Sequence, residues 1–138
     1  MMNKRFVPLI AAAFSLLMAV VLVVGAAAAP DPFRGKWYST DLADGSSQSL
    51  VIGGGPGGSY HVRYFDAGAT VCGAAVDGVW PFAASAQGFL SASGPTLSGT
   101  LSVICMKSPP EVFGDHLFSY TYNADGTLSD SDGATWSH

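Results

Sequence analysis

After Pro30, apolar and polar residues alternate along most of the chain, and turn-forming residues recur about every eight to twelve positions. This spacing is typical of an all-β sandwich or barrel, and no long helical periodicity follows Pro30. The pattern predicts about eight strands. They are expected at residues 35–41, 47–53, 59–66, 69–76, 79–86 (with a short piece at 88–93), 96–105, 116–123, 127–131 and 134–138.

The connections between these segments carry turn chemistry. Asp44-Gly45 and Asp77-Gly78 are favoured hairpin pairs, and the glycines of Gly54–Gly58 permit a tight turn. The segment 106–115 contains Pro109-Pro110 and is expected to be a loop, because proline excludes regular structure there.

Short turns make consecutive strands antiparallel neighbours, so the predicted topology is a meander. Closing the meander on itself would remove its exposed edges, and eight strands enclose just enough space for side chains or one small ligand. The expected fold is therefore an all-β, eight-stranded antiparallel meander closed into a small barrel. A two-sheet β-sandwich is the alternative.

The N-terminal residues 1–29 have the organisation of an export signal. Lys4 and Arg5 provide positive charge, residues 6–24 form an apolar run, and Gly25–Ala29 supplies small residues for cleavage. The apolar run approaches the length that spans a bilayer, so an uncleaved anchor through residues 6–24 is the alternative. We expect a secreted or extracytoplasmic protein with one β domain at 30–138, preceded by a signal helix.

Export changes the interpretation of the two cysteines, Cys72 and Cys105. An oxidising compartment favours their pairing, and a bridge between residues 33 positions apart would add about 3–4 kcal/mol to stability. Two free thiols are the alternative. The bridge would matter because a domain this small has little stability to spare.

The charge of the chain argues against a nucleic-acid partner. The formal net charge is -4, and loss of Lys4 and Arg5 with the signal would make it -6. The remaining cations are Arg34, Lys36, Arg63 and Lys107. Four scattered cations cannot neutralise a phosphate backbone.

The stretch Gly35-Lys36-Trp37-Tyr38 opens the first predicted strand and resembles the Gly-x-Trp signature of the calycin superfamily, which includes lipocalins and avidin-like proteins. The resemblance implies that Trp37 plugs one end of the barrel and that Gly35 lets another segment pack closely. Lipocalins also place a basic residue near the last strand to stack on the tryptophan; this chain departs from that pattern, because it ends in His138 and offers Arg34 as a substitute. Residues 130–136 resemble the end of small secreted bacterial proteins.

Catalytic and metal motifs are weak. No Gly-x-Ser-x-Gly elbow is present, and His61, His116 and His138 have no neighbouring motif that would make one a base, so we expect no enzyme activity and no cofactor. Asp130 and Asp132 are better explained by a hairpin turn than by a calcium site. His61, Asp66 and His116 could bind a transition metal only if the segments 59–66 and 116–123 approach each other, and surface positions are favoured instead.

The aromatic residues suggest a binding role. A cup lined by aromatic side chains would stack on an apolar ligand, although the same side chains could simply be the core. The residues in question are Tyr60, Tyr64, Trp80, Phe82, Phe118, Tyr120 and Tyr122. The expected function is a non-catalytic binding module for a small apolar molecule. The alternatives are a protein-interaction or inhibitor module acting on an extracellular protein through residues 54–58 or 107–115, and a structural envelope protein.

Overall fold

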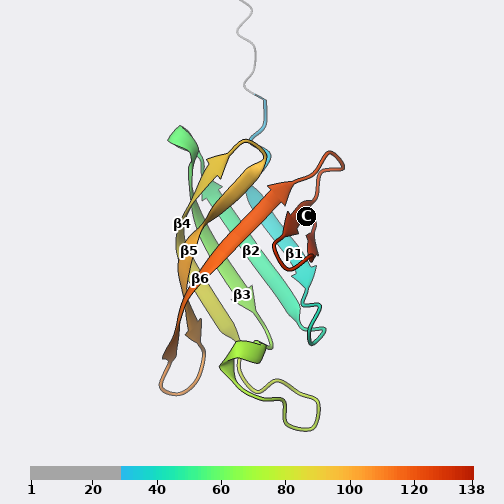
Figure 1. The fold of residues 1–138 in the computed structure, drawn as a ribbon, viewed down its shortest axis with the longest axis vertical. Helices are drawn as coiled ribbons and strands as arrows, with labels where there is room; N and C mark the ends of the chain where they lie inside the picture. Colours follow the sequence, from blue (N-terminus) through green and yellow to red (C-terminus); the bar gives the residue numbers. More distant parts are fainter. Residues whose placement is uncertain (1–28) are drawn as a thin grey trace, which may run out of the picture.

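The computed structural model describes residues 29–138, so the expected signal, apart from Ala29, lies outside the described part of the chain. Eight strands follow one another (Figure 1). They are β1 (Gly35–Thr40), β2 (Ser47–Gly54), β3 (Ser59–Asp66), β4 (Ala84–Ser93), β5 (Thr96–Cys105), β6 (Glu111–Tyr122), β7 (Leu128–Asp130) and β8 (Thr135–Trp136). Two short 3-10 turns, η1 (Pro56–Gly58) and η2 (Thr70–Cys72), complete the elements.

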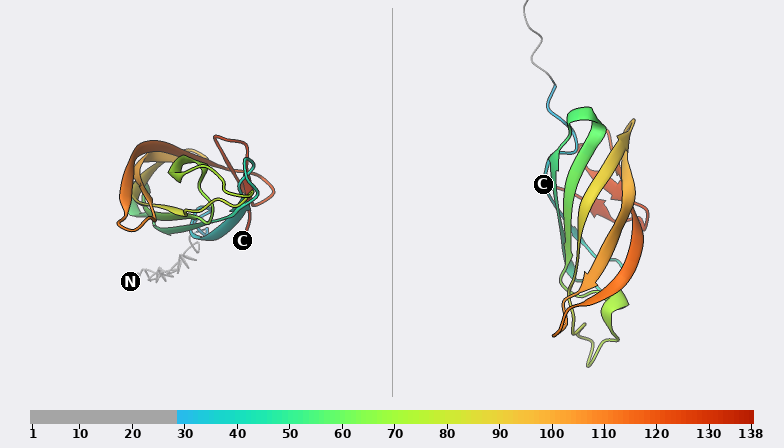
Figure 2. Two further views of the ribbon diagram at one scale, coloured as in Figure 1. Left: turned by 90° about the horizontal axis from the view of Figure 1, so that it is seen from below. Right: turned by 90° about the vertical axis from the view of Figure 1, so that its left-hand side faces the viewer.

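The strands form one sheet in the order β1 to β8, with every neighbouring pair antiparallel. The sheet curls into a nearly closed barrel, which appears as a ring when viewed from below (Figure 2, left). The predicted all-β meander is therefore confirmed, the barrel it forms is nearly closed, and the sandwich alternative is wrong.

Alternation along each strand sends one set of side chains into the barrel. On β3, Tyr60 and Val62 point inward while His61 and Arg63 are exposed. The interior is filled by aliphatic residues from β2, β4 and β5 and by two tryptophans, Trp37 and Trp136, that are almost completely buried. The core follows from period-two patterning on neighbouring strands.

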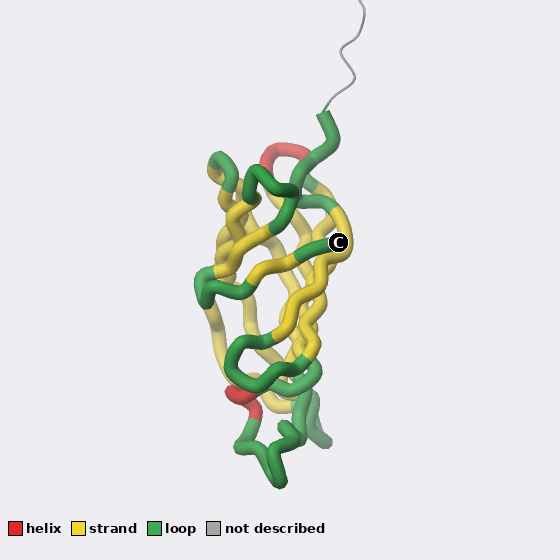
Figure 3. Tube along the Cα trace, turned by 90° about the vertical axis from the view of Figure 1, so that its right-hand side faces the viewer, coloured by secondary structure: helices red, strands yellow, loops and turns green. Residues whose placement is uncertain are grey.

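Closure of the barrel depends on the last strands (Figure 3). The amide of Tyr38 donates to the carbonyl of Ser137 at 2.8 Å, and the amide of Ser137 donates back to Tyr38 at 3.0 Å. Strand β7 covers only residues Tyr120–Tyr122 of β6. The rest of β6, residues 111–119, has no strand partner on its outer edge among residues 29–138. The barrel is thus closed along one half of its height and open along the other.

The predicted strands at 69–76 and 79–86 are wrong. Residues 67–83 form one long connection that contains η2 and an isolated bridge between Val76 and Val79. The segment 69–76 is rich in alanine and glycine, whose side chains bury too little area to hold a strand in the sheet. Pro81 further prevents a ladder, so β4 begins only at Ala84 and absorbs the short piece at 88–93.

The predicted loop at 106–115 is also too long. Strand β6 begins at Glu111, directly after Pro109-Pro110. Val103 pairs with Gly114 whereas Ile104 pairs with Val112, so Phe113 is an extra residue in a β-bulge. The bulge lets the strand continue where the sequence suggested irregular structure.

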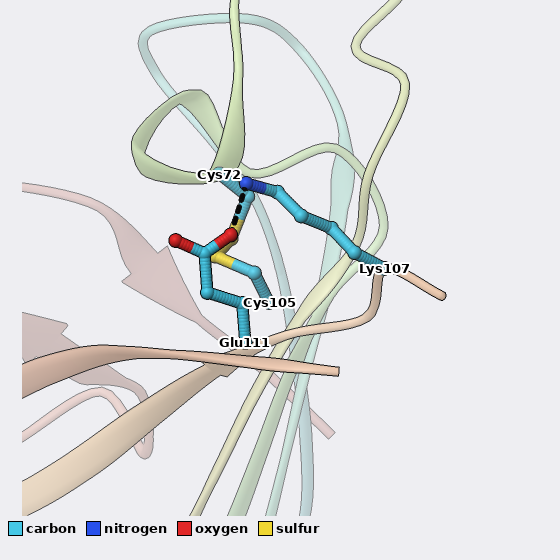
Figure 4. Close-up of a disulfide and its surroundings, with 4 residues drawn as sticks. All are labelled: Cys72, Cys105, Lys107 and Glu111. Atoms are coloured by element: carbon cyan, nitrogen blue, oxygen red, sulfur yellow. Dashed lines mark hydrogen bonds and ion pairs between the residues drawn. A yellow bond between two sulfur atoms is a disulfide. The ribbon is translucent and has the colours of Figure 1, made fainter. Parts of the chain in front are cut away.

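Cys72 and Cys105 form the expected disulfide, with 5.4 Å between their Cα atoms (Figure 4). It ties η2 in the 67–83 connection to the last residue of β5. Beside it, the Lys107 ammonium contacts a carboxylate oxygen of Glu111 at 2.6 Å and lies 5.4 Å from the centre of the Phe82 ring. The bridge therefore holds the long connection against one end of the barrel.

Replacing both cysteines by serine should lower the free energy of unfolding by about 3–4 kcal/mol, because the unfolded chain regains the freedom of a closed loop. Chemical denaturation of the oxidised protein and of the Cys72→Ser/Cys105→Ser variant measures the difference. As a control, dithiothreitol should lower the midpoint of the native protein and leave that of the variant unchanged. Equal midpoints for the oxidised protein and the variant would show that the bridge does not stabilise the fold.

The opposite end of the barrel is packed shut. Trp37 is 0% exposed, and its indole Nε1 donates to the Phe33 carbonyl at 2.9 Å. The His138 imidazole stacks on Trp37 with 3.8 Å between ring centres. Phe33 contacts Tyr60 edge-on at 5.4 Å, and the Tyr60 hydroxyl donates to Asp31 at 2.8 Å. A layer of packed rings therefore occupies that end.

Gly35 makes the histidine stack possible. Its φ of +148° is a conformation that favours glycine, and a Cβ at this position would stand 2.6 Å from Cε1 of His138. Any larger residue must therefore displace the His138 ring from Trp37.

Gly35→Ala should lower the free energy of unfolding by about 2 kcal/mol, through backbone strain and the clash with His138. The matched control is Gly53→Ala in β2, where a Cβ meets nothing within 4 Å, so its effect should be neutral or slightly stabilising. In a His138→Ala background the Gly35→Ala cost should shrink, because the clash is gone. Identical costs in both backgrounds would contradict the close approach. Denaturant unfolding of the parent, the three single variants and the Gly35→Ala/His138→Ala double variant measures these costs.

Candidate functional site

A cavity of about 210 Å³ lies at the open half of the barrel, on the inner side of β6. Buried residues from β2, β3, β4 and β5 form its floor, including Gln48, Asp66 and Ala84. Exposed residues form its rim, among them Thr70 of η2 and Leu117 of β6. The cavity is therefore reached from solvent and sits where β7 is too short to cover β6.

Four aromatic side chains make one wall. The Tyr64 ring is 5.3 Å from Phe118 and 6.2 Å from Trp136, measured between ring centres. Tyr120 meets Trp136 edge-on at 5.7 Å, with an interplanar angle of 89°. These rings come from β3, β6 and β8, so they converge only after the barrel closes. All four line the cavity, and aromatic side chains can stack on an apolar ligand.

A chain of hydrogen bonds makes the floor polar. The Gln48 Nε2 group donates to Asp41 Oδ2 at 2.9 Å and to the Tyr64 hydroxyl at 3.0 Å. The Tyr64 hydroxyl donates to Asp66 Oδ2 at 3.3 Å. Asp66 Oδ1 also accepts from the Ser46 hydroxyl and from the Gly68 amide. The network fixes these side chains before any ligand arrives.

Gln48 is left incompletely bonded in this network. Its side chain is only 8% exposed, yet Oε1 has no hydrogen-bond partner among residues 29–138. Asp41 can only accept when ionised, and this determines that the amide nitrogen of Gln48 faces it. The free amide oxygen is then a buried acceptor without a donor, which costs stability unless something supplies one.

The cavity is negatively charged. The carboxylates of Asp41, Asp66, Asp130 and Asp132 line it, and no lysine or arginine does. Within residues 29–138 the single ion pair, Lys107 with Glu111, belongs to other groups. The charges of these carboxylates are therefore not neutralised by a cationic side chain.

This environment changes the acidity of several groups. Burial raises the pKa of Asp41 above its usual value, an effect that the Ala43 amide opposes and the charges of Asp44 and Asp66 reinforce. Burial also raises the pKa of the Tyr64 phenol, with a further contribution from the charge of Asp66.

Tyr120 behaves like Tyr64. Burial raises the pKa of the Tyr120 phenol, and the charges of Asp130 and Asp132 raise it further. At the closed end, burial and then the hydrogen bond to Asp31 raise the pKa of Tyr60. All three phenols are therefore harder to ionise in the folded chain than in the unfolded one.

The structure separates the aromatic residues that the sequence grouped. Tyr64, Phe118 and Tyr120 line the cavity, as predicted for a ligand cup. Tyr60 and Tyr122 pack around Phe33 at the closed end and do not reach it. Trp80 and Phe82 lie in the 67–83 connection and are not in the wall either. Trp37 lies at the closed end, stacked under His138.

Sequence reasoning missed the polar floor and Trp136. Gln48 shares the inward phase of Leu50 and Ile52 on β2, so a polar residue on the buried face was the available signal. Asp130 accepts from the Trp136 indole at 3.0 Å and from two turn amides, and nothing local announces that arrangement.

The suggested metal group is not assembled. Strand β3 pairs with β2 and β4, not with β6, and His61 stands outside the barrel against Phe89 while Asp66 points inside. In residues 29–138, no set of three or more His, Cys, Asp or Glu side chains is arranged to hold a metal ion. Asp130 organises the β7–β8 turn instead, as the hairpin interpretation predicted.

Comparison with protein-family models, curated protein sequences and solved structures found no significant match. Across residues 29–138, neither helical turn has the length and apolar character needed to cross a membrane. The functional argument therefore depends on the geometry of the cavity.

The raised phenol pKa values predict alkaline instability. A raised folded-state pKa contributes stability that is complete below the unfolded value near 10 and is lost as pH rises beyond it. Tyrosinate absorbance from Tyr60, Tyr64 and Tyr120 should therefore appear together with loss of the circular dichroism signal. Tyr38→Phe, at an exposed position, should leave that coupled step unchanged. Ionisation of these three phenols near pH 10 in a folded protein would contradict their burial.

Proposed function

We propose that the protein is an exported, non-catalytic binding module that holds a small molecule in the cavity inside β6. The observation that carries this proposal is the convergence of four aromatic rings and a fixed polar network at the one open part of the barrel wall. A purely structural barrel would gain stability by filling this space with apolar side chains, whereas here its floor is polar.

The size and chemistry of the cavity define the ligand further. Its volume of about 210 Å³ is below the roughly 300–1,000 Å³ of sites for drug-sized molecules, which favours a ligand of about one ring and a short chain. The sequence alone suggested an apolar ligand. The floor of Asp41, Gln48 and Asp66 favours one that also carries a polar end.

Export is supported by two features of the chain. Residues 1–29 have the organisation of a signal peptide, and the Cys72–Cys105 bridge is compatible with an oxidising compartment. A calycin-like ancestry is supported by the placement of Trp37 at the closed end with the basic His138 stacked on it.

A protein-interaction role has one observation in its favour. The free edge of β6 presents Val112, Phe113 and Leu117, and Leu117 is 70% exposed. Such an edge can accept a strand from a partner. However, Glu111 and Asp115 place charges on the strand and the bulge at Phe113 distorts it, which are devices that discourage edge pairing. The cavity is therefore the better supported site.

Filling the cavity should weaken binding. Ala69 is buried and lines the cavity, whereas Ala67 is exposed and does not. We expect Ala69→Leu to weaken binding at least about tenfold, because its added carbons occupy ligand space, and Ala67→Leu to bind like the parent.

The probes are three ring compounds of similar shape: 2-phenylethylammonium, 2-phenylethanol and phenylacetate. Isothermal titration calorimetry with the full chain measures each affinity. Binding of at least one probe, weakened by Ala69→Leu and not by Ala67→Leu, supports the proposal. Absence of binding by all three, or equal affinities for the two variants, overturns it.

A further inference from the structure

The geometry points to an organic ammonium ion, with N–H donors next to an apolar ring, as the ligand class of the cavity. This inference rests on the proposed binding function and adds the charge and the donor groups of the ligand. Two independent features of the cavity carry it: its carboxylates, which have no cationic partner, and its wall of aromatic rings.

The carboxylates lack a protein counterion. Asp66 is 4% exposed and has only uncharged hydrogen-bond donors around it: the Ser46 hydroxyl, the Gly68 amide and the Tyr64 hydroxyl. Asp41 likewise receives only amide donors, from Ala43 and Gln48. A positively charged ligand would offset their repulsion, whereas an anion would add to it.

The cationic side chains lie elsewhere. Arg34 and Lys36 are near the closed end, Arg63 is exposed on the outer face of β3, and Lys107 pairs with Glu111. His116 is the one basic side chain that lines the cavity, and it is an exposed rim residue. The electrostatic potential inside the cavity is therefore determined by the carboxylates.

The acceptors of the cavity favour a ligand with hydrogen-bond donors. Gln48 lines the cavity and is more than nine-tenths buried, and its Oε1 is enclosed by protein atoms without a partner in the described residues. The acceptors that line the cavity are therefore the carboxylates, and an ionised carboxylate can only accept a hydrogen bond. This favours a primary or secondary ammonium over a quaternary one, which has no N–H to donate.

The aromatic wall suits the same charge. Three contacts between strands join the four rings of this wall. The interplanar angle is 61° between Tyr64 and Phe118, 58° between Tyr64 and Trp136, and 89° between Tyr120 and Trp136. A cation beside ring faces of tyrosine or tryptophan is attracted by their electron density, and the apolar part of the ligand stacks on the remaining surface. A neutral alcohol of the same shape gains the stacking but not the attraction.

The test compares the three ring probes named above at low ionic strength. We expect 2-phenylethylammonium to bind at least about tenfold more tightly than 2-phenylethanol, and phenylacetate to bind most weakly, because only the first combines positive charge with three N–H donors. Raising the salt concentration should weaken the binding of 2-phenylethylammonium and leave the affinity for 2-phenylethanol unchanged.

Variants assign the selectivity to the cavity. Asp66→Asn should reduce the preference for the ammonium over the alcohol, and Asp132→Asn, at an exposed rim position, should do so to a smaller extent without affecting the fold. Asp77→Asn removes the same charge from an exposed loop residue that does not line the cavity, so its preference should equal the parent's. If Asp66→Asn does not fold, Asp132→Asn measured against Asp77→Asn decides the matter.

The outcomes separate this inference from the proposed function. Equal affinity for the ammonium and the alcohol, both lost in Ala69→Leu, overturns the ammonium preference and retains the binding module. Failure of every probe to bind overturns both. Ammonium binding that persists in Ala69→Leu, or that falls equally in Asp132→Asn and Asp77→Asn, places the charge effect outside the cavity and overturns the inference.

Discussion

The two hydrogen bonds between Tyr38 and Ser137 close the sheet into a barrel. The rest of the architecture depends on how short this contact is between the first and last strands. Strand β8 has two residues and β7 has three, while β6 has twelve. A last hairpin of this length can join β1 to β6 over only part of the barrel height. The part beyond its reach is the open wall, and the cavity lies behind that wall.

The two ends of the barrel consequently have different chemistry. The closed end consists of stacked rings, with Trp37 bonded to the Phe33 carbonyl and covered by His138. The open end keeps Asp66 and Gln48 on inward-facing strand positions where aliphatic residues would pack better. Apolar burial and the disulfide supply the stability that these polar residues forgo. Such a division is expected where a local feature is retained for binding and the remaining fold tolerates its cost.

The sequence predicts well which side chains face the barrel interior, but it predicts poorly where they lie along the barrel axis. Tyr60 and Tyr64 share the inward face of β3, and alternation alone groups them as ligand candidates. Four residues of strand separate them by about 13 Å at ~3.3 Å per residue, so Tyr60 reaches the closed end and Tyr64 the cavity. Trp136 joins Tyr64 only through the β1–β8 contact, which is a nonlocal event that no residue pattern encodes.

The errors in strand placement have the same origin. The segment 69–76 alternates in a formal sense, but its alanines and glycine offer little area to bury, and tertiary structure keeps it out of the sheet. Cys72 pairs with Cys105 as expected even though it sits in a turn and not in the predicted strand. The pairing was predicted from cysteine chemistry and the expected compartment, which do not depend on secondary structure.

The position of that bridge connects the compartment to the cavity. Ala69, Thr70 and Val71 contribute to the cavity lining and come directly before Cys72. No strand ladder holds this part of the 67–83 connection; its backbone bonds are those of Ala69 with Phe82 and Cys72 with Ala69. The disulfide is thus the covalent restraint on one wall of the site. Under reducing conditions the wall would recover the conformational entropy of a long loop, whereas an oxidising compartment keeps it in place. The same bond that stabilises the fold therefore makes the shape of the cavity depend on oxidising conditions.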